Sequence, residues 1–186
     1  MSDASIYRRA LDELGGVFDR IDHAAVDAAV ARIAAARTVV VFGGGREGLQ
    51  IRGFAMRLFH LGRSVAVVGD MTTPPVGPGD LFLVTVGPGE ISTALALMGV
   101  AKAAGADILL LTAQPQGRCA ALADSVLVIP AQTMANDQGA AATSVLPMGS
   151  LYEGALYVLF EVMVLKLREA LAVSPEVMRG NHTNLE

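Results

Sequence analysis

Short apolar runs alternate with stretches of helical spacing along most of the chain. Five runs rich in Val, Leu and Ile are each followed within three residues by glycine or proline, which is typical of buried strands in a parallel sheet. We expect these strands at residues 38–42, 64–68, 81–86, 107–112 and 125–129. The alternation predicts an α/β fold in which one doubly wound domain has helices flanking a five-stranded parallel sheet with right-handed crossovers.

The helices are predicted from apolar spacing and from their start and stop signals. Residues 5–36 carry two helices, because Gly15, Gly16 and the Asp22 region interrupt the spacing, and Asp22 suits an N-cap. Within the sheet core at 38–130, further helices are expected at about 47–61, after the third strand to about 104, and briefly at 119–123. Prolines between residues 69 and 79 predict a loop there.

The C-terminal part, residues 147–186, is dominated by one long helix that continues to about residue 171. This helix is apolar on nearly all sides, which predicts burial in a subunit interface. Before it, residues 130–144 are small and polar and predict a long loop, the segment most able to move. Whether this loop closes as a lid is left open. Ser174 and Pro175 predict the start of a last short helix.

Composition narrows the class of protein. The 186 residues suit a single domain with a substantial core. The chain is 53% hydrophobic and 17% charged, with a mean hydropathy of +0.49, so we expect apolar surface to be covered by further copies of the chain. No apolar run reaches about 18 residues, so we expect no membrane span. The N-terminus lacks the apolar run of a signal peptide.

Charge and cysteine content exclude other partners. The net charge of −4 and the lack of a basic stripe argue against a nucleic-acid partner. Three His and one Cys without ligand spacing argue against a metal site. The single cysteine, Cys119, excludes an internal disulfide and fits a reducing compartment, so a cytoplasmic location is expected.

Two predicted strands end in glycine-rich loops that lead into helices. The first loop is Gly-Gly-Gly-Arg-Glu-Gly at residues 43–48, and the second is Gly-Pro-Gly-Glu at residues 87–90. Parallel strands bring such loops to one edge of the sheet, where free N–H groups of helix starts can bind an anion. The sequence therefore predicts a ligand site between these two loops.

Few side chains near this edge carry chemistry. Glu153, in the first turn of the long helix, suits either a helix-dipole partner or a general base, and the residues alone leave both open. Arg46 suits an anion clamp or a solvated ion pair, and Glu90 suits a cap or a ligand contact. His182 lies in a polar tail, where a lone histidine is more often incidental.

The chain resembles the sugar isomerase (SIS) domain family, and within it most closely the 6-phospho-3-hexuloisomerases. The resemblance runs from about residue 5 to the last residue. Its specific motifs are Pro147-Met-Gly-Ser-Leu-Tyr-Glu153 and the ending His182-Thr-Asn-Leu-Glu186, with weaker matches at Gly43-Gly-Gly-Arg46, Phe54-Ala-Met-Arg-Leu58, Val68-Gly-Asp-Met-Thr-Thr-Pro74 and Gly87-Pro-Gly-Glu90.

This resemblance implies a five-stranded SIS domain with flavodoxin-like layering, assembled as a tetramer (with a dimer as the alternative) that has sites at subunit contacts. It implies interconversion of a hexulose phosphate and fructose 6-phosphate through an enediolate, without a cofactor. Glu153 matches the family's base, and His182 matches a terminal histidine that assists ring opening or proton transfer. It leaves open whether His182 serves its own or a neighbouring subunit. Arg46, Thr72 and Thr73 match substrate-side positions of the family. Together with the two glycine-rich loops and the helix start that follows, the candidate substrate-binding residues are Gly45, Arg46, Glu47, Thr72, Thr73, Gly87, Gly89, Glu90, Ser92 and Thr93.

The chain departs from the family where the phosphate is held. Glu47 replaces the serine of the first loop, and Val86, Pro88 and Ile91 replace hydroxyl residues of the second. Each lost charge-assisted hydrogen bond is worth roughly 1.5–3 kcal/mol. Ser92 and Thr93 could supply hydroxyls from a shifted position.

Three functions therefore stay open. The first is an isomerase of sugar phosphates, and the second is the same chemistry on a non-phosphorylated sugar-like ligand. The third is a non-catalytic module that binds a carbohydrate derivative. A sensor of that third kind is usually joined to a DNA-binding or partner domain, which these residues do not contain, and has little need of Glu153 and His182 together.

Overall fold

Five parallel strands form a single sheet in the computed structural model, which describes residues 3–185. The strands are β1 (Val39–Gly43), β2 (Val65–Val67), β3 (Leu81–Thr85), β4 (Asp107–Thr112) and β5 (Ser125–Val128), in the spatial order β2-β1-β3-β4-β5. In register, Val41 of β1 pairs with Val67 of β2 and Leu83 of β3. The predicted α/β fold and its five strands are confirmed, each within two residues of its expected ends.

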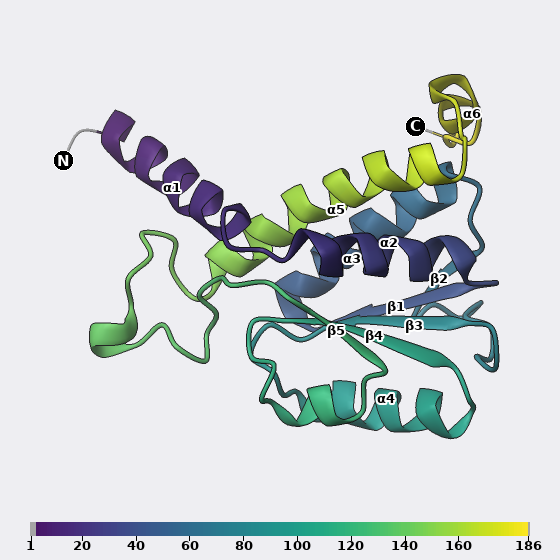
Figure 1. Cartoon of the computed structure of the whole chain (residues 1–186), viewed down its shortest axis with the longest axis horizontal. Helices are drawn as coiled ribbons and strands as arrows, with labels where there is room; N and C mark the ends of the chain where they lie inside the picture. Colours follow the sequence, from purple (N-terminus) through teal and green to yellow (C-terminus); the bar gives the residue numbers. More distant parts are fainter. Residues whose placement is uncertain (1–2, 186) are drawn as a thin grey trace.

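Helices cover both faces of the sheet (Figure 1). One face carries α2 (His23–Ala35), α3 (Gly45–His60) and α5 (Ser150–Ala170), and the other carries α4 (Ser92–Ala103) with the short 3-10 helix η1 (Arg118–Ala121). Helix α1 (Asp3–Phe18) contacts α5, and α6 (Pro175–Gly180) lies at the other end of the molecule. The segment expected as a short helix at 119–123 is this 3-10 turn.

Alternate residues of each strand point to opposite faces and build two cores. Val39 and Val41 of β1 pack beneath α2, α3 and α5, whereas Val40 packs toward α4. Both cores are apolar, so the strands are hydrophobic along their whole length, as parallel strands covered on both faces must be. This continuous pattern is why the sequence locates the strands well.

The N-terminal helix does not break at its glycines. Helix α1 runs through Gly15 and Gly16 and ends at Phe18, and Asp22 caps α2 as predicted, its carboxylate accepting two backbone N–H groups. Glycine in a helix costs about 1 kcal/mol. Burial of Val17 and packing against α5 offset that cost, because they hold this turn of α1 in place.

Helix α5 is buried along one side only. Its inner side includes Phe160, whose ring stacks on that of Phe54 at 4.4 Å between centroids. The apolar side chains that it leaves accessible are those of Tyr157, Val158, Val162 and Leu165. A single chain thus covers one side of α5, and the expected burial of its other apolar side chains in a subunit interface stays a prediction.

The segment at residues 129–149 is a long loop with one 3-10 turn, η2 (Gly139–Ala141). The Glu13 carboxylate of α1 accepts hydrogen bonds from the Ser144 hydroxyl at 2.5 Å and the Val145 N–H at 3.1 Å. This loop is therefore tied to α1 just before it reaches α5.

The described residues hold neither a membrane-spanning helix nor a cluster of metal-binding side chains. No helix among residues 3–185 is long and apolar enough to cross a membrane. Over the same residues, no three His, Cys, Asp or Glu side chains are grouped closely enough to hold a metal ion.

Candidate active site

A pocket of about 410 Å³ opens where β1 and β3 end. Its walls come from the β1–α3 loop, the β3–α4 loop, the segment around residues 133–134 and the first turn of α5. Both glycine-rich loops thus meet at one edge of the sheet, as the sequence predicts. The chemistry-bearing residues that line the pocket are Arg46, Glu47, Tyr152 and Glu153.

Glu47 points inward, to the end of β3. It is 7% exposed, and its carboxylate accepts hydrogen bonds from the Thr85 hydroxyl at 2.7 Å and from the Gly87 N–H at 3.0 and 3.1 Å. The Tyr152 hydroxyl, itself buried, lies 3.0 Å from that of Thr85 and extends the chain of hydrogen bonds. Burial raises the pKa of Glu47, and the charge of Glu153 adds to this, while the bonds from Thr85 and Gly87 oppose it.

Glu153 lies opposite, in the first turn of α5, and is paired with Arg46. The Arg46 guanidinium lies 3.1 Å from the Glu153 carboxylate and also donates to the Ser150 hydroxyl at 2.8 Å and to the Met148 carbonyl. Burial raises the pKa of Glu153, and the positive charge of Arg46 opposes the rise. A carboxylate whose pKa lies above its usual value is a stronger base at neutral pH.

The turn before α5 requires glycine at one position. Gly149 has φ = 77°, and a Cβ placed there would lie 3.0 Å from the Met134 backbone nitrogen. Only glycine adopts this conformation without strain and permits so close an approach. The turn thereby allows the 133–134 segment to lie directly against the start of α5.

The structure brings together only part of the predicted site. Gly45, Arg46, Glu47 and Glu153 line the pocket, and Gly87 lies behind it, bonded to Glu47. The other substrate-binding candidates after β3 lie outside this lining: Glu90 pairs with Arg118 at 2.7 Å, Gly89 packs on Gln114 and Gly117, and Ser92 and Thr93 are exposed at the start of α4.

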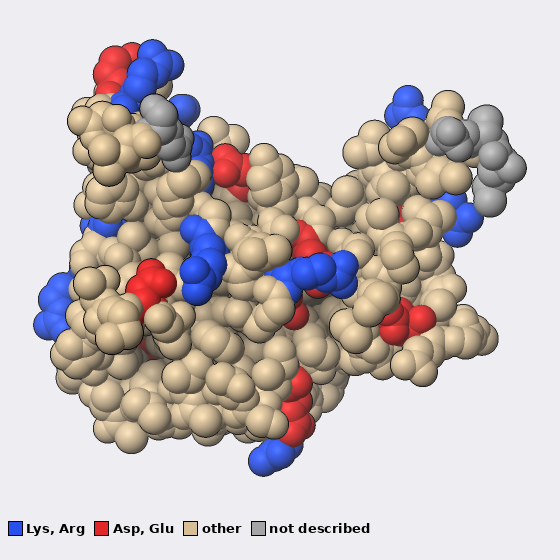
Figure 2. All heavy atoms as spheres, turned by 180° about the vertical axis from the view of Figure 1, so that it is seen from behind, with Lys and Arg blue, Asp and Glu red and all other residues tan. Residues whose placement is uncertain are grey.

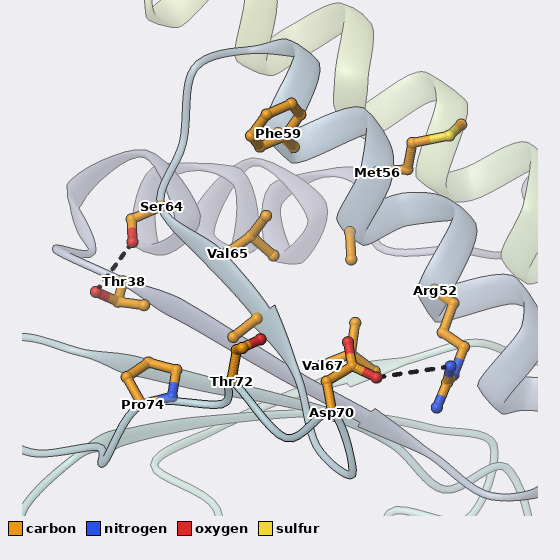
Figure 3. Close-up of a pocket in the computed structure, with 12 residues that line it drawn as sticks. Thr38, Arg52, Met56, Phe59, Ser64, Val65, Val67, Asp70, Thr72 and Pro74 are labelled. Atoms are coloured by element: carbon orange, nitrogen blue, oxygen red, sulfur yellow. Dashed lines mark hydrogen bonds and ion pairs between the residues drawn. The ribbon is translucent and has the colours of Figure 1, made fainter. Parts of the chain in front are cut away.

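Thr72 and Thr73 lie elsewhere in the chain. Thr72 lines a separate pocket of about 560 Å³ at the outer edge of β2, together with Arg52 and Asp70, whose side chains approach to 4.0 Å (Figure 3). The Thr73 hydroxyl donates to the carbonyls of Val67 and Asp70 and so fastens its own loop. Within one chain neither threonine reaches the pocket at β1 and β3.

His182 also lies away from the pocket. Its ring packs beside that of His60, the last residue of α3, with 5.1 Å between the centroids. Glu47 belongs to the first turn of the same helix, and Glu153 and α6 lie at opposite ends of α5 (Figure 1). At 1.5 Å per residue, the length of α5 after Glu153 is roughly 25 Å. A single chain therefore does not bring Glu153 and His182 together.

Several contributors to the site were not predicted. Thr85 and Tyr152 complete the hydrogen bonds around Glu47, and Ser150 and Met148 hold Arg46. The sequence carries one signal for Thr85, which is the only hydroxyl residue within β3. Tyr152 lies inside the specific motif at 147–153, but nothing in the motif shows which way its ring points.

Comparison with known proteins agrees with this architecture. A sequence profile of the SIS domain matches residues 32–158. A 3-hexulose-6-phosphate isomerase from Bacillus subtilis is 32% identical over 95% of both chains, and one from Mycobacterium gastri is 38% identical over 94% of this chain and 87% of its own.

A crystal structure of a hypothetical protein from Methanococcus jannaschii superposes over all of both chains with a TM-score of 0.82 at 24% identity. That protein is inferred from its structure to be a 3-hexulose-6-phosphate isomerase, and the likeness to this chain shows a shared fold. The profile match and the similar relatives agree with the α/β architecture described above. The chain therefore belongs to the SIS domain family.

Proposed function

We propose that this protein is a cofactor-independent isomerase that interconverts a 3-hexulose 6-phosphate and fructose 6-phosphate. The observation that carries the proposal is Glu153, a partly buried carboxylate with a raised pKa that faces a pocket of about 410 Å³ and is paired with Arg46. The relatives named 3-hexulose-6-phosphate isomerase, 32–38% identical over most of the chain, support the reaction and its substrate class.

In this mechanism Glu153 removes a proton from the carbon beside the carbonyl group and returns it to the former carbonyl carbon. The hydroxyl proton of the first carbon passes to the oxygen of the second, so that the carbonyl and hydroxyl groups exchange places. The intermediate enediolate carries negative charge on oxygen, and Arg46 is the cation beside it. When Glu153 accepts the proton it loses its charge, which frees the Arg46 guanidinium to stabilise the enediolate oxygen. The ion pair of the unliganded site therefore holds the base, Glu153, and the cation, Arg46, beside each other where the reaction needs both.

We further propose a homo-oligomer, a tetramer rather than a dimer, in which His182 of one subunit assists ring opening at the pocket of another. The apolar side chains exposed on α5 suit such an interface, as do the exposed Met56 and Phe59 of α3. Figure 2 shows a face on which charged side chains are sparse. Cys119, which is buried and free, suits a cytoplasmic location.

The test is proton exchange in deuterated water. The wild-type protein should isomerise the hexulose phosphate and incorporate deuterium at the reacting carbon, and Glu153→Gln should lose both while still binding the ligand. Glu161→Gln, the same substitution two turns further along α5 at a residue paired with Arg57, is the control and should remain active. Binding without exchange in the wild-type protein would instead support a non-catalytic module.

The shared site is tested by mixing two inactive variants. If His182 serves a neighbouring pocket, oligomers assembled from Glu153→Gln chains and His182→Ala chains contain some pockets with both groups intact, so activity should return. If each chain used its own histidine, every pocket would lack one group and the mixture would stay inactive. Unmixed variants are the controls.

A further inference from the structure

We infer that Glu47 determines which part of the ligand enters the inner end of the pocket: it accepts neutral hydroxyl groups of the sugar there and excludes an oxyanion such as phosphate. The inference rests on the proposed function only in taking the ligand to be a sugar. It adds an orientation, in which a phosphate on the substrate lies toward the pocket mouth, away from Glu47.

The donors at the end of β3 are already used by the protein. An anion at a strand end is held by backbone N–H groups and hydroxyls. Here the Gly87 N–H donates to both Glu47 oxygens, and the Thr85 hydroxyl donates to one of them at 2.7 Å. Glu47 thus occupies, with its own carboxylate, the place that an oxyanion would take.

The residues of the β3–α4 loop that line the pocket, Pro88 and Ile91, carry no side-chain donor. Pro88 lines the pocket and has no N–H, and Ile91 lines it with an apolar side chain. The loop glycine Gly89 packs against Gln114, since a Cβ added at Gly89 would lie only 2.7 Å from the Cβ of Gln114. An oxyanion at this end would lose hydration without gaining a hydrogen bond from these side chains.

The charges of the pocket point the same way. Its described lining holds one cation, Arg46, and two carboxyl groups, Glu47 and Glu153. Arg46 is occupied by Glu153, Ser150 and the Met148 carbonyl. A dianion beside Glu47 would therefore meet like charge in a partly dehydrated site, where repulsion is stronger than in water.

Sugar hydroxyls suit the same position. A carboxylate offers about four lone-pair sites, and among residues 3–185 the donors to Glu47 are Thr85 and Gly87. The carboxyl group also lines the pocket, so a hydroxyl of the ligand can donate to the remaining capacity. Hydrogen bonds to a charged acceptor are stronger than neutral ones, which favours a polyhydroxyl chain at this end.

The experiment compares fructose, fructose 6-phosphate and inorganic phosphate by titration calorimetry on the wild-type protein and on Glu47→Gln. The glutamine keeps the shape and an acceptor oxygen but removes the charge. We expect the affinity ratio of fructose 6-phosphate to fructose to rise at least tenfold in Glu47→Gln, and inorganic phosphate to compete with fructose in the variant but not in the wild type.

Asp27→Asn is the matched control, because it removes the same unit of charge from an exposed ion pair with Lys166 on the surface. It should leave the ratio unchanged, and Glu47→Asp, which keeps the charge, should keep the discrimination. An unchanged ratio in Glu47→Gln, or competition by phosphate in the wild type, would overturn the inference. The wild-type competition does not depend on the folding of any variant.

The affinity test of Glu47 and the proton-exchange test of the proposed function can fail independently. If proton exchange fails on every hexulose while the affinity ratio shifts as expected, the isomerase proposal fails and the role of Glu47 stands. If exchange succeeds while the ratio does not move, the isomerase stands and Glu47 loses this role.

Discussion

A methyl group added at Gly87 tests the packing that holds Glu47 in place. A Cβ there would lie 2.9 Å from two ring carbons of Tyr152 and 3.0 Å from a Glu47 oxygen. Gly87 does not have a positive φ, so alanine fits its backbone and the effect is steric. The Tyr152 ring is 1% exposed and its hydroxyl is bonded to Thr85, so it cannot retreat without breaking that bond.

The magnitude follows from these contacts. Overpacking of a core costs about 1–3 kcal/mol. A weakened Gly87–Glu47 hydrogen bond adds about 0.5–1.5 kcal/mol. The smaller entropy of the unfolded alanine chain returns about 0.4–1 kcal/mol. We therefore expect Gly87→Ala to lower the free energy of unfolding by about 0.5–4 kcal/mol, and a loss of about 2 kcal/mol would lower Tm by roughly 4–8 °C.

The assay is equilibrium unfolding in urea, followed by circular dichroism at a fixed protomer concentration because assembly would add to stability. Gly99→Ala is the control: this exposed glycine lies inside α4, and its Cβ would meet nothing within 4 Å. Alanine there should stabilise the helix by up to about 1 kcal/mol. Equal stabilities for the two variants would refute the packing argument.

Two further predictions concern charge and the long loop. Because burial raises the pKa of Glu47 in the folded state, its contribution to stability is full below the ordinary carboxyl pKa of about 4.3 and is lost as pH rises through the folded value. The free energy of unfolding of the wild-type protein, minus that of Glu47→Gln, should therefore fall as the pH rises over that window. Urea unfolding at a series of pH values measures this difference, and a difference that does not change with pH would contradict the prediction. Glu13→Ala should remove the hydrogen bonds to Ser144 and Val145, at a cost of about 1–3 kcal/mol, and speed amide exchange in residues 130–149. The exposed neighbour Asp12→Ala should not, and equal exchange in the two variants would exclude Glu13 as the anchor.

The local sequence pattern predicts an element well where all of its residues share the same surroundings, as in a strand that is covered on both faces. Both ends of the strand at 107–112 are predicted correctly. Both faces of β4 are covered, so its four inner residues are all apolar and its polar residues stand only at its two ends. Asp22 and Ser174 are located equally well, since a cap bonds to backbone groups two or three residues away. Where the tertiary contact outweighs the local signal, as at Gly15 and Gly16, the prediction is less exact.

The sequence by itself determined the α/β fold, the two glycine-rich loops at one sheet edge and Glu153 at the start of a helix, because these depend on periodicity and short-range hydrogen bonds. Only the tertiary structure decided that Glu47 turns inward to Thr85 and Gly87, about 40 residues further along the chain. It also separated His182 and Thr72 from the pocket. The Glu47 contacts depend on how α3 packs against β3, and the place of His182 depends on where α5 ends. Neither can be predicted from a short stretch of sequence.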